Sequence, residues 1–222
     1  MKISEFLNIK PGMTAIIGGG GKTSLMYALA EELMSSGRVI VCTSTKIMRP
    51  EGIPVFSGQD EAALEKEFDR THVVCVGEEY GGGKLTAPAF PFGRLLSIAR
   101  YVLVEADGSN RLPMKAHAPG EPVIPEAAGL SILVMGAGGF GRTIRSAAHR
   151  PALFAQLAGA SEDDVITPEL AARVAQAEGF HDCVFVNQVE SDATLAAARL
   201  LQTLVDCPVI AGSLRLKEYI HI

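Results

Sequence analysis

The amino-acid sequence predicts a single α/β domain, in which a mostly parallel β-sheet is flanked by helices. Three observations carry this prediction. Short apolar segments typical of buried strands alternate with segments of helical spacing along most of the 222 residues. The glycine-rich segment GGGGKTS stands between the first such strand and the first helix. The acidic segment EADG directly follows another apolar strand.

The first half of the chain is expected to supply four strands and three helices. In the first helix, Leu25, Leu29 and Leu33 recur four residues apart, which places them on one helical face. The GGG segment within 78–86 predicts the tip of a hairpin, because extended residues follow it. The strands are expected at 13–17, 38–43, 72–77 and 101–105, and the helices at 23–35, 60–68 and 92–99.

The second half continues this alternation. Thr167 and Pro168 are a helix start signal, because threonine caps a first turn and proline is tolerated at the first helical position. The composition does not shift sharply, so residues 1–222 are expected to form one domain. Residues 108–125 contain four prolines and predict a long functional loop. The remaining strands are expected at 130–135, 183–186 and 208–210, and the helices at 147–158, 168–177 and 192–204.

The composition argues against several classes of function. The net charge is −5, from 20 basic and 25 acidic side chains, whereas duplex nucleic-acid binders usually show a basic surface. The apolar segments are too short to span a bilayer, and residues 1–11 lack the apolar stretch of a signal peptide. We therefore expect a cytoplasmic protein with no nucleic-acid or membrane partner. The cysteines lack CxxC spacing and lie in or beside apolar segments, so reduced core positions are expected at Cys42, Cys75, Cys183 and Cys207.

The glycine-rich segment has the order strand, loop, helix that phosphate-binding loops require. Glycines allow backbone N–H groups to turn around an anion, and the helix N-terminus adds a favourable dipole. A lysine at this point would contact the outer phosphates of a nucleotide, and the next hydroxyl would join a Mg²⁺ shell. The alternative is a glycine-rich turn that binds nothing. The predicted phosphate-binding residues are Gly18, Gly19, Gly20, Gly21, Lys22, Thr23 and Ser24.

This loop is shorter than the strict phosphate-loop motif, which has a further glycine where Ile16 stands here. The pattern is G-x-x-G-K-T, and it resembles the shortened loop of ATP-dependent Mur ligases. The expected fold is therefore similar to that of P-loop nucleoside triphosphatases, with a shortened glycine-rich loop. The expected cofactors are Mg²⁺ and a nucleoside triphosphate, either ATP or GTP.

Two carboxylates follow the apolar strand at 101–105. Glu105 and Asp107 point to the same side if the chain stays extended, because side chains alternate along a strand. A carboxylate at this strand end typically binds Mg²⁺ or orients water in P-loop enzymes, so both are candidate metal ligands and catalytic groups. The alternative is an acidic strand end exposed to water. Thr43 and Thr45 follow the second strand and are candidate contacts for the metal or the substrate.

Several of these segments together resemble one family, the YqeC-type accessory proteins of selenium-dependent molybdenum hydroxylases. The matching segments are IIGGGGKTSLMYALAEEL, TSTK, VLVEADGSNRLPMKAHAPGEPVIP and HRP. The resemblance implies a P-loop-type bacterial accessory protein that serves the maturation of these hydroxylases. Its implied partners are an unidentified small-molecule or cofactor substrate and a molybdenum hydroxylase or its maturation proteins. His117 and Gly120 stand in a variable part of the third segment and are given no role.

Further charged residues are assigned roles through their place in these segments. His149 is a candidate for proton transfer, and Arg150 for stabilising charge on a transferred phosphoryl group; without the resemblance both would be ordinary surface residues. In the proline-rich segment, Arg111, Lys115 and Glu121 are expected to form a substrate-facing wall over the nucleotide. A solvated surface loop is the alternative for this segment.

The segment NQVE at 187–190 resembles the motif N-K-x-D, which reads the base in GTP-binding proteins. Asn187 matches, and Glu190 stands where the motif has an aspartate that accepts hydrogen bonds from guanine. The alternative is a turn between a strand and a helix, capped by Ser191 or Asp192. A guanine preference is therefore one of two open interpretations.

The leading functional hypothesis is a Mg²⁺-dependent nucleotide-binding accessory protein that acts as a nucleoside triphosphatase or phosphotransferase. Phosphoryl transfer depends mostly on positioning and charge stabilisation, which these residues would supply. The alternative is a carrier that holds a molybdopterin nucleotide without cleaving it. The candidate catalytic residues are Lys22, Glu105, Asp107, His149 and Arg150, and the candidate metal ligands are Thr23, Glu105 and Asp107.

Overall fold

The computed structural model describes residues 2–222 and is built around one large β-sheet. Most of its strands coincide with apolar segments of the sequence. The strands of this sheet are β1 (Gly12–Gly18), β2 (Val39–Thr43), β4 (Val55–Phe56), β5 (Val73–Val76), β8 (Tyr101–Glu105), β10 (Ala128–Gly136), β12 (Cys183–Asn187), β13 (Val209–Ser213) and β14 (Glu218–His221).

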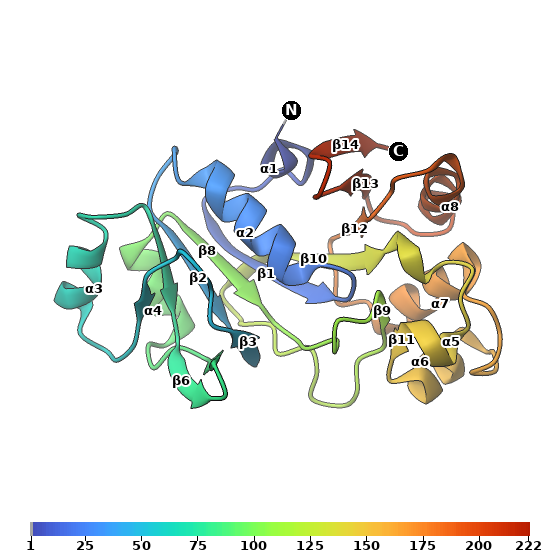
Figure 1. Cartoon of the computed structure of the whole chain (residues 1–222), viewed down its shortest axis with the longest axis horizontal. Helices are drawn as coiled ribbons and strands as arrows, with labels where there is room; N and C mark the ends of the chain where they lie inside the picture. Colours follow the sequence, from blue (N-terminus) through green and yellow to red (C-terminus); the bar gives the residue numbers. More distant parts are fainter. Residues whose placement is uncertain (1) are drawn as a thin grey trace.

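The sheet is parallel except at one edge. Within residues 2–222 its nine strands run in the order β14-β13-β12-β10-β1-β8-β2-β5-β4 (Figure 1). The β13–β14 pair is antiparallel, and every other neighbouring pair is parallel. The predicted fold class, a mostly parallel sheet flanked by helices, is therefore confirmed.

Helices cover both faces of the sheet. Ile16 of β1 packs toward α1 (Ile3–Phe6) and α2 (Lys22–Leu33), whereas its neighbours Ala15 and Ile17 pack toward the opposite face. This alternation follows from the two-residue period of a strand. On the opposite face lie α3 (Glu61–Glu67), α4 (Phe92–Ile98), α5 (Ile144–Ala147), α6 (Pro151–Ala158), α7 (Pro168–Glu178) and α8 (Asp192–Gln202).

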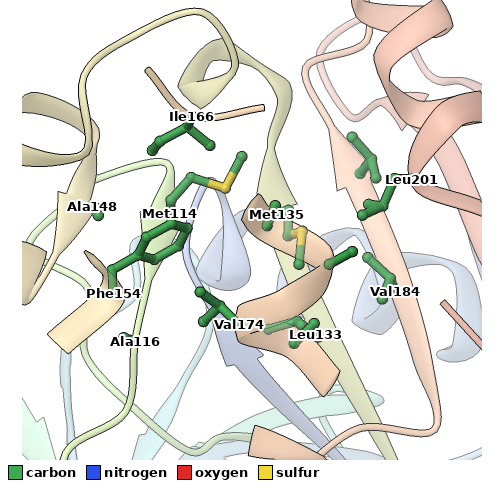
Figure 2. Packing of buried hydrophobic residues seen from close by; sticks show 14 of the residues in the cluster. Met114, Ala116, Leu133, Met135, Ala148, Phe154, Ile166, Val174, Val184 and Leu201 are labelled. Carbon is green, nitrogen blue, oxygen red and sulfur yellow. The ribbon is translucent and has the colours of Figure 1, made fainter. Parts of the chain in front are cut away.

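The largest hydrophobic cluster lies under α6 and α7. Figure 2 shows Phe154 of α6 beside Met114, with Val174 of α7 over Leu133 of β10. Phe154 is 2% exposed and Val174 3%. This packing fixes α7 on the half of the sheet that contains β10 and β12. The last residue of α7 is Glu178, whose position is therefore fixed as well.

Two small sheets stand outside the large one. Strand β3 (Lys46–Met48) pairs with β7 (Lys84–Thr86), and β7 pairs with β6 (Glu78–Gly81), both antiparallel. The predicted hairpin at 78–86 is thus present, and β3 adds a third strand to it. The second small sheet pairs β9 (Met114–Lys115) with β11 (Ala148–His149) in parallel.

The structure corrects the predicted helix at 147–158. Helix α5 ends at Ala147, β11 follows, and α6 begins only at Pro151. Arg150 has a φ of 64°, in the left-handed region, and stands directly before the proline. Proline disfavours the helical conformation of the residue before it, so the helix divides here. The predicted loop at 108–125 likewise contains a strand, β9.

Within residues 2–222, no helix combines the length and the apolar character that crossing a membrane requires.

Candidate functional site

The glycine-rich loop lies at the carboxyl end of β1, between β1 and α2. Strand β1 is flanked by β8 and β10, which come from different parts of the chain. In open parallel sheets, ligands bind in the crevice at the carboxyl ends of the strands, where the strand order reverses. The fold therefore places the loop at the edge where a ligand site is expected.

Three backbone N–H groups of this loop are bonded within the protein. The donors are Gly18, Gly19 and Gly20, and their acceptors are Asp107 Oδ2 at 2.8 Å, the Val134 carbonyl at 2.9 Å and the Leu112 carbonyl at 3.0 Å. In the described chain, the N–H groups of residues 21–24 have no such acceptor. These four belong to the start of α2, where helices present unpaired donors to anions. The N–H groups that are available to an anion are thus those of the second half of the loop.

The structure explains why glycines occupy this loop. A Cβ on Gly20 would lie 2.3 Å from the backbone nitrogen of Gly136, and one on Gly21 would lie 2.5 Å from Asn187 Nδ2. The φ angles are +75° at Gly20 and +123° at Gly21, which side chains rarely tolerate. Close packing against β10 and β12 therefore requires glycine here, independently of any ligand.

Lys22 folds back onto the loop. Its Nζ donates to the Gly18 carbonyl at 2.7 Å and to Ser109 Oγ at 3.1 Å, and it lies 3.0 Å from Asp107 Oδ1. Lys22 is only 3% exposed. The ammonium group is thus held at the mouth of the loop, beside the start of α2.

Thr23 and Glu105 bring a hydroxyl and a carboxylate together beside the loop. Thr23 Oγ1 donates to Glu105 Oε2 at 2.6 Å. Burial raises the pKa of Glu105, and nearby Lys22 and the hydrogen bond from Thr23 only partly offset this. Thr43 Oγ1 donates to the Glu105 carbonyl at 2.7 Å, and Thr45 donates its N–H to Thr43 Oγ1 at 3.0 Å. Thr43 and Thr45 therefore support the strand end that presents Glu105.

Asp107 is surrounded by donors and is fully buried. It contacts the Gly18 N–H and Lys22 as described, Lys115 Nζ at 3.4 Å and His117 Nε2 at 2.5 Å. Burial alone would raise the pKa of Asp107, but the hydrogen bond from His117 and the charges of Lys22 and Lys115 lower it. Of the two carboxylates predicted as metal ligands, only Glu105 lines the cleft beside the loop.

His117, for which the sequence predicts no role, links Asp107 to α7. Its Nδ1 lies 2.7 Å from Glu178 Oε2, and its backbone N–H donates to Glu178 Oε1 at 2.6 Å. Burial alone would lower the pKa of His117, but its hydrogen bonds to Asp107 and Glu178 raise it. Glu178 lies 61 residues further along the chain, so no local pattern indicates this contact.

Two of the three residues of the predicted wall, Lys115 and Glu121, bond within the protein. Lys115 Nζ donates to the Gly108 carbonyl at 2.7 Å and pairs with Glu121 at 3.0 Å. Glu121 in turn accepts from Arg150 Nη2 at 2.7 Å. Arg150 therefore connects to Lys22 only through Glu121, Lys115 and Asp107. Arg111, the third residue of this wall, does line the cleft.

His149 lies next to this chain of ion pairs. Its backbone carbonyl accepts from the Ala116 N–H at 3.2 Å in the β9–β11 pairing. Burial and the charges of Lys115 and Arg150 lower the pKa of His149. Neither His149 nor Arg150 lines the clefts described next.

Two open clefts meet at the start of α2. The hairpin-side cleft, with a volume of about 540 Å³, lies between this helix start, β3, β7 and residues 108–111. The C-terminal cleft, with a volume of about 710 Å³, lies between α2, residues 187–190 and residues 213–217. Both are lined by Gly21, Ser24 and Gln188. A ligand anchored at the helix start can therefore extend to either side.

The predicted base-reading residues line the C-terminal cleft. Asn187 Nδ2 donates to the Gly20 carbonyl at 2.8 Å, and its Oδ1 accepts from the Leu214 N–H at 3.1 Å. Glu190 accepts from Ser213 Oγ at 2.7 Å and from Arg215 Nε at 3.1 Å. The structure thus brings Asn187 to the glycine loop, whereas the carboxylate of Glu190 is already bonded within the protein.

The comparisons with known proteins agree with the resemblance stated from the sequence. The profile of the YqeC protein family matches residues 14–152, which include the glycine loop, Glu105, Asp107 and His117. The protein named "Uncharacterized protein YqeC" of Escherichia coli strain K12 is 29% identical over 213 residues, covering 88% of this chain and 83% of that relative.

Among solved structures, one similar chain is the 54 kDa protein of the signal recognition particle from Aeropyrum pernix K1, in complex with GDP. The match has a TM-score of 0.41 and 13% identity, and it covers 96% of this chain but only 44% of that one. The family profile covers more than half of the chain described here. The chain therefore belongs to the YqeC family.

Proposed function

We propose that this protein binds a nucleoside triphosphate together with Mg²⁺ at the start of α2, as a nucleoside triphosphatase or phosphotransferase. The observation that carries the proposal is the convergence of three features at one point. The unpaired N–H groups of residues 21–24, the ammonium of Lys22 and the Thr23–Glu105 pair all meet there. This combination suits the phosphates of a nucleotide and the cation that accompanies them.

The residues present fit a magnesium ion. Mg²⁺ prefers hard oxygen ligands and is usually bound by one or two protein groups, with substrate phosphates and water completing the shell. Thr23 Oγ1 and Glu105 Oε2 are 2.6 Å apart, and both residues line the hairpin-side cleft. They would hold the ion, which when bound neutralises charge on the phosphates.

Asp107 has a different part in this proposal. Its carboxylate is enclosed by Lys22, Lys115, His117 and the Gly18 N–H, so it serves to position Lys22 and the loop. When Lys22 turns to a phosphate, Asp107 keeps Lys115 and His117 as partners. The lysine can therefore move without leaving a buried carboxylate uncompensated.

The C-terminal cleft would take the nucleoside. Asn187 forms hydrogen bonds to the Gly20 carbonyl of the glycine loop and to the backbone N–H of Leu214. It therefore sets the distance between the proposed phosphate site and this cleft. Because Ser213 and Arg215 already bond Glu190, reading guanine through Glu190 would require these bonds to be replaced. We therefore propose that both ATP and GTP bind, with a weak base preference.

The role in maturation of selenium-dependent molybdenum hydroxylases follows from the family and is proposed on that basis. Nucleotide hydrolysis would drive a delivery or activation step. A second candidate function is a carrier for a molybdopterin dinucleotide. The observation that favours it is the presence of a cleft on each side of the helix start, which suits an elongated ligand with a central pyrophosphate.

The test is calorimetric titration of the full chain with ATP, GTP, CTP and a molybdopterin dinucleotide, each with and without Mg²⁺. We expect Mg²⁺-dependent binding of the triphosphates and slow release of phosphate. Lys22→Ala should weaken triphosphate binding about 100-fold, because a buried charged contact is lost. Lys66→Ala, an exposed lysine on α3, is the matched control and should change nothing.

Two results would contradict the proposal. Unchanged triphosphate affinity in Lys22→Ala would remove the loop from the mechanism. Binding of the dinucleotide alone, without phosphate release from any triphosphate, would favour the carrier function.

A further inference from the structure

A group of cations lines the hairpin-side cleft opposite the glycine loop. Lys46 comes from β3, Lys84 from β7 and Arg111 from the segment after β8. All three side chains are exposed. Among residues 2–222, none of them has a carboxylate oxygen within 4.0 Å, whereas Lys22 and Lys115 each have two carboxylate partners.

The charges of this cleft do not balance. Four cations line it, counting Lys22, against the single carboxylate of Glu105. Lys22 already faces Asp107 at 3.0 Å, so three positive charges remain without a carboxylate partner in the described residues. Of these three, the Lys46 ammonium lies 3.7 Å from the centre of the Tyr80 ring, a contact that leaves its charge uncompensated. A cleft lined by charges of one sign concentrates ligands of the opposite sign. Mg²⁺ at Thr23 and Glu105 would add further positive charge.

The hairpin places two of these cations on one face. Ile47 of β3 and Leu85 of β7 are buried in the core, so the alternation along each strand turns Lys46 and Lys84 to the other face. Thr86 Oγ1 donates to the Thr45 carbonyl at 2.9 Å, which ties β7 to the end of β2. In Figure 1, β3 lies at the carboxyl end of β2, on the side where β8 also ends.

The segment that presents Arg111 has an unusual backbone conformation. Asn110 has a φ of 49° and Arg111 a φ of 62°, two consecutive non-glycine residues in the left-handed region. Left-handed backbone conformations of non-glycine residues persist where the surrounding structure requires them, and they occur often at ligand sites. Ser109, directly before them, accepts a hydrogen bond from Lys22 at 3.1 Å. The same short segment therefore contacts the lysine of the loop and aims Arg111 at the cleft.

We propose that Lys46, Lys84 and Arg111 form a subsite for a second, anionic small molecule that carries a phosphate or a carboxylate. This ligand shares the hairpin-side cleft with the outer phosphates of the nucleotide. The inference rests on the proposed nucleotide function and deepens it. A protein that only hydrolyses nucleotide needs water as its second substrate, whereas these cations select an anion.

The probes for this subsite are inorganic phosphate and succinate, which separate a phosphate-bearing from a carboxylate-bearing ligand. Each is titrated into the full chain saturated with Mg²⁺ and a non-hydrolysable triphosphate, so that the start of α2 is already occupied. We expect one probe to bind with one-to-one stoichiometry and to weaken with added salt. The triple variant Lys46→Ala, Lys84→Ala and Arg111→Ala should weaken that probe about tenfold or more and leave nucleotide affinity within about threefold.

Two further variants make the test specific. Arg49→Ala removes a cation that follows β3 but pairs with Glu79 and does not line the cleft, so it should leave probe binding unchanged. Lys84→Glu should weaken the probe more than Lys84→Ala, because it reverses the charge. Urea unfolding midpoints equal to that of the unaltered protein show that each variant is folded.

The outcomes separate this inference from the proposed function. Failure of both probes to bind the nucleotide-loaded protein overturns the subsite, as does an equal loss of nucleotide and probe affinity in the triple variant. If the unaltered protein binds no nucleotide, the proposed function fails, and phosphate and succinate titrated separately into Lys22→Ala decide the subsite alone. Binding that the triple change weakens would then support the subsite, and absence of binding would overturn it.

Discussion

The charged residues near the glycine loop fall into two groups, one buried and one exposed. In the buried group, Asp107, Lys22, Lys115 and His117 all have opposite charges within hydrogen-bond or ion-pair distance. In the exposed group, Lys46, Lys84 and Arg111 face the hairpin-side cleft, with no carboxylate partner within residues 2–222. Buried charges must be compensated for the chain to fold, whereas exposed cations can remain unpaired until a ligand arrives.

This comparison predicts that the two groups respond to substitution in different measurements. Changes in the buried group should lower the free energy of unfolding. Changes in the exposed group should leave that free energy nearly unchanged and alter ligand affinity, as argued above for the triple variant.

The largest expected effect is that of Asp107→Asn. The substitution removes the carboxylate that Lys22, Lys115 and His117 share in a buried site. Loss of one partner of a buried ion pair typically lowers the free energy of unfolding by about 3–5 kcal/mol. Urea unfolding at neutral pH measures the loss. Asp163→Asn is the matched control, because Asp163 is an exposed partner of Arg145. If both variants unfold at the same urea concentration, burial is not what distinguishes the two groups.

A smaller, pH-dependent effect is expected for His117→Gln. The pKa of His117 is raised in the folded state by Asp107 and Glu178. A histidine of this kind stabilises the folded state most below its unfolded pKa of about 6.5, and the contribution is lost as the pH rises through the folded value. The difference in unfolding free energy between the two proteins should therefore be about 1–2 kcal/mol near pH 6 and should shrink at higher pH.

The matched control for this pH series is His72→Gln, because His72 is exposed and contacts none of these carboxylates. A difference for His117→Gln that stays constant from pH 6 to pH 9 would contradict a charged histidine between the two acids.

The smallest effect is expected at Glu190, which is exposed although it is bonded to neighbouring side chains. Glu190 is held by Ser213 and Arg215 in the C-terminal cleft, and these donors lower its pKa. Exposed ion pairs contribute little to stability, so Glu190→Gln should not shift the urea midpoint measurably. We also expect the ratio of GTP to ATP affinity to change by less than about threefold. A tenfold loss specific to GTP would show that Glu190 reads guanine after all.

The sequence predicted most strands and helices because they follow clear local patterns. The order of strand, glycine loop and helix placed Lys22 and Thr23, and the strand end placed Glu105 beside them. These relations depend on residues near in sequence or on the shared edge of a parallel sheet. The two-residue strand β4 and the four-residue helix α1 are too short for such a pattern, and β14, with the sequence EYIH, lacks a continuous apolar segment.

The parts that could not be predicted depend on contacts between distant segments. The His117 ring contacts Asp107 and Glu178 of α7, and only the folded chain brings these three residues together. Lys115 was expected to face a substrate, but its position in β9 turns it toward Asp107 and Glu121. The division of the predicted helix at Arg150 has a local signal, the proline that follows, which alone does not distinguish a helix start from a break.

The internal hydrogen bonds of the glycine loop also affect the rate at which a ligand binds. Gly18, Gly19 and Gly20 hold their conformation through Asp107, Val134 and Leu112, so the loop has its shape before any ligand arrives. Binding of the proposed nucleotide then needs no ordering of these three residues, so we expect association to be governed by diffusion and by the charge of the cleft. Added salt should therefore reduce the association rate more than it raises the dissociation rate.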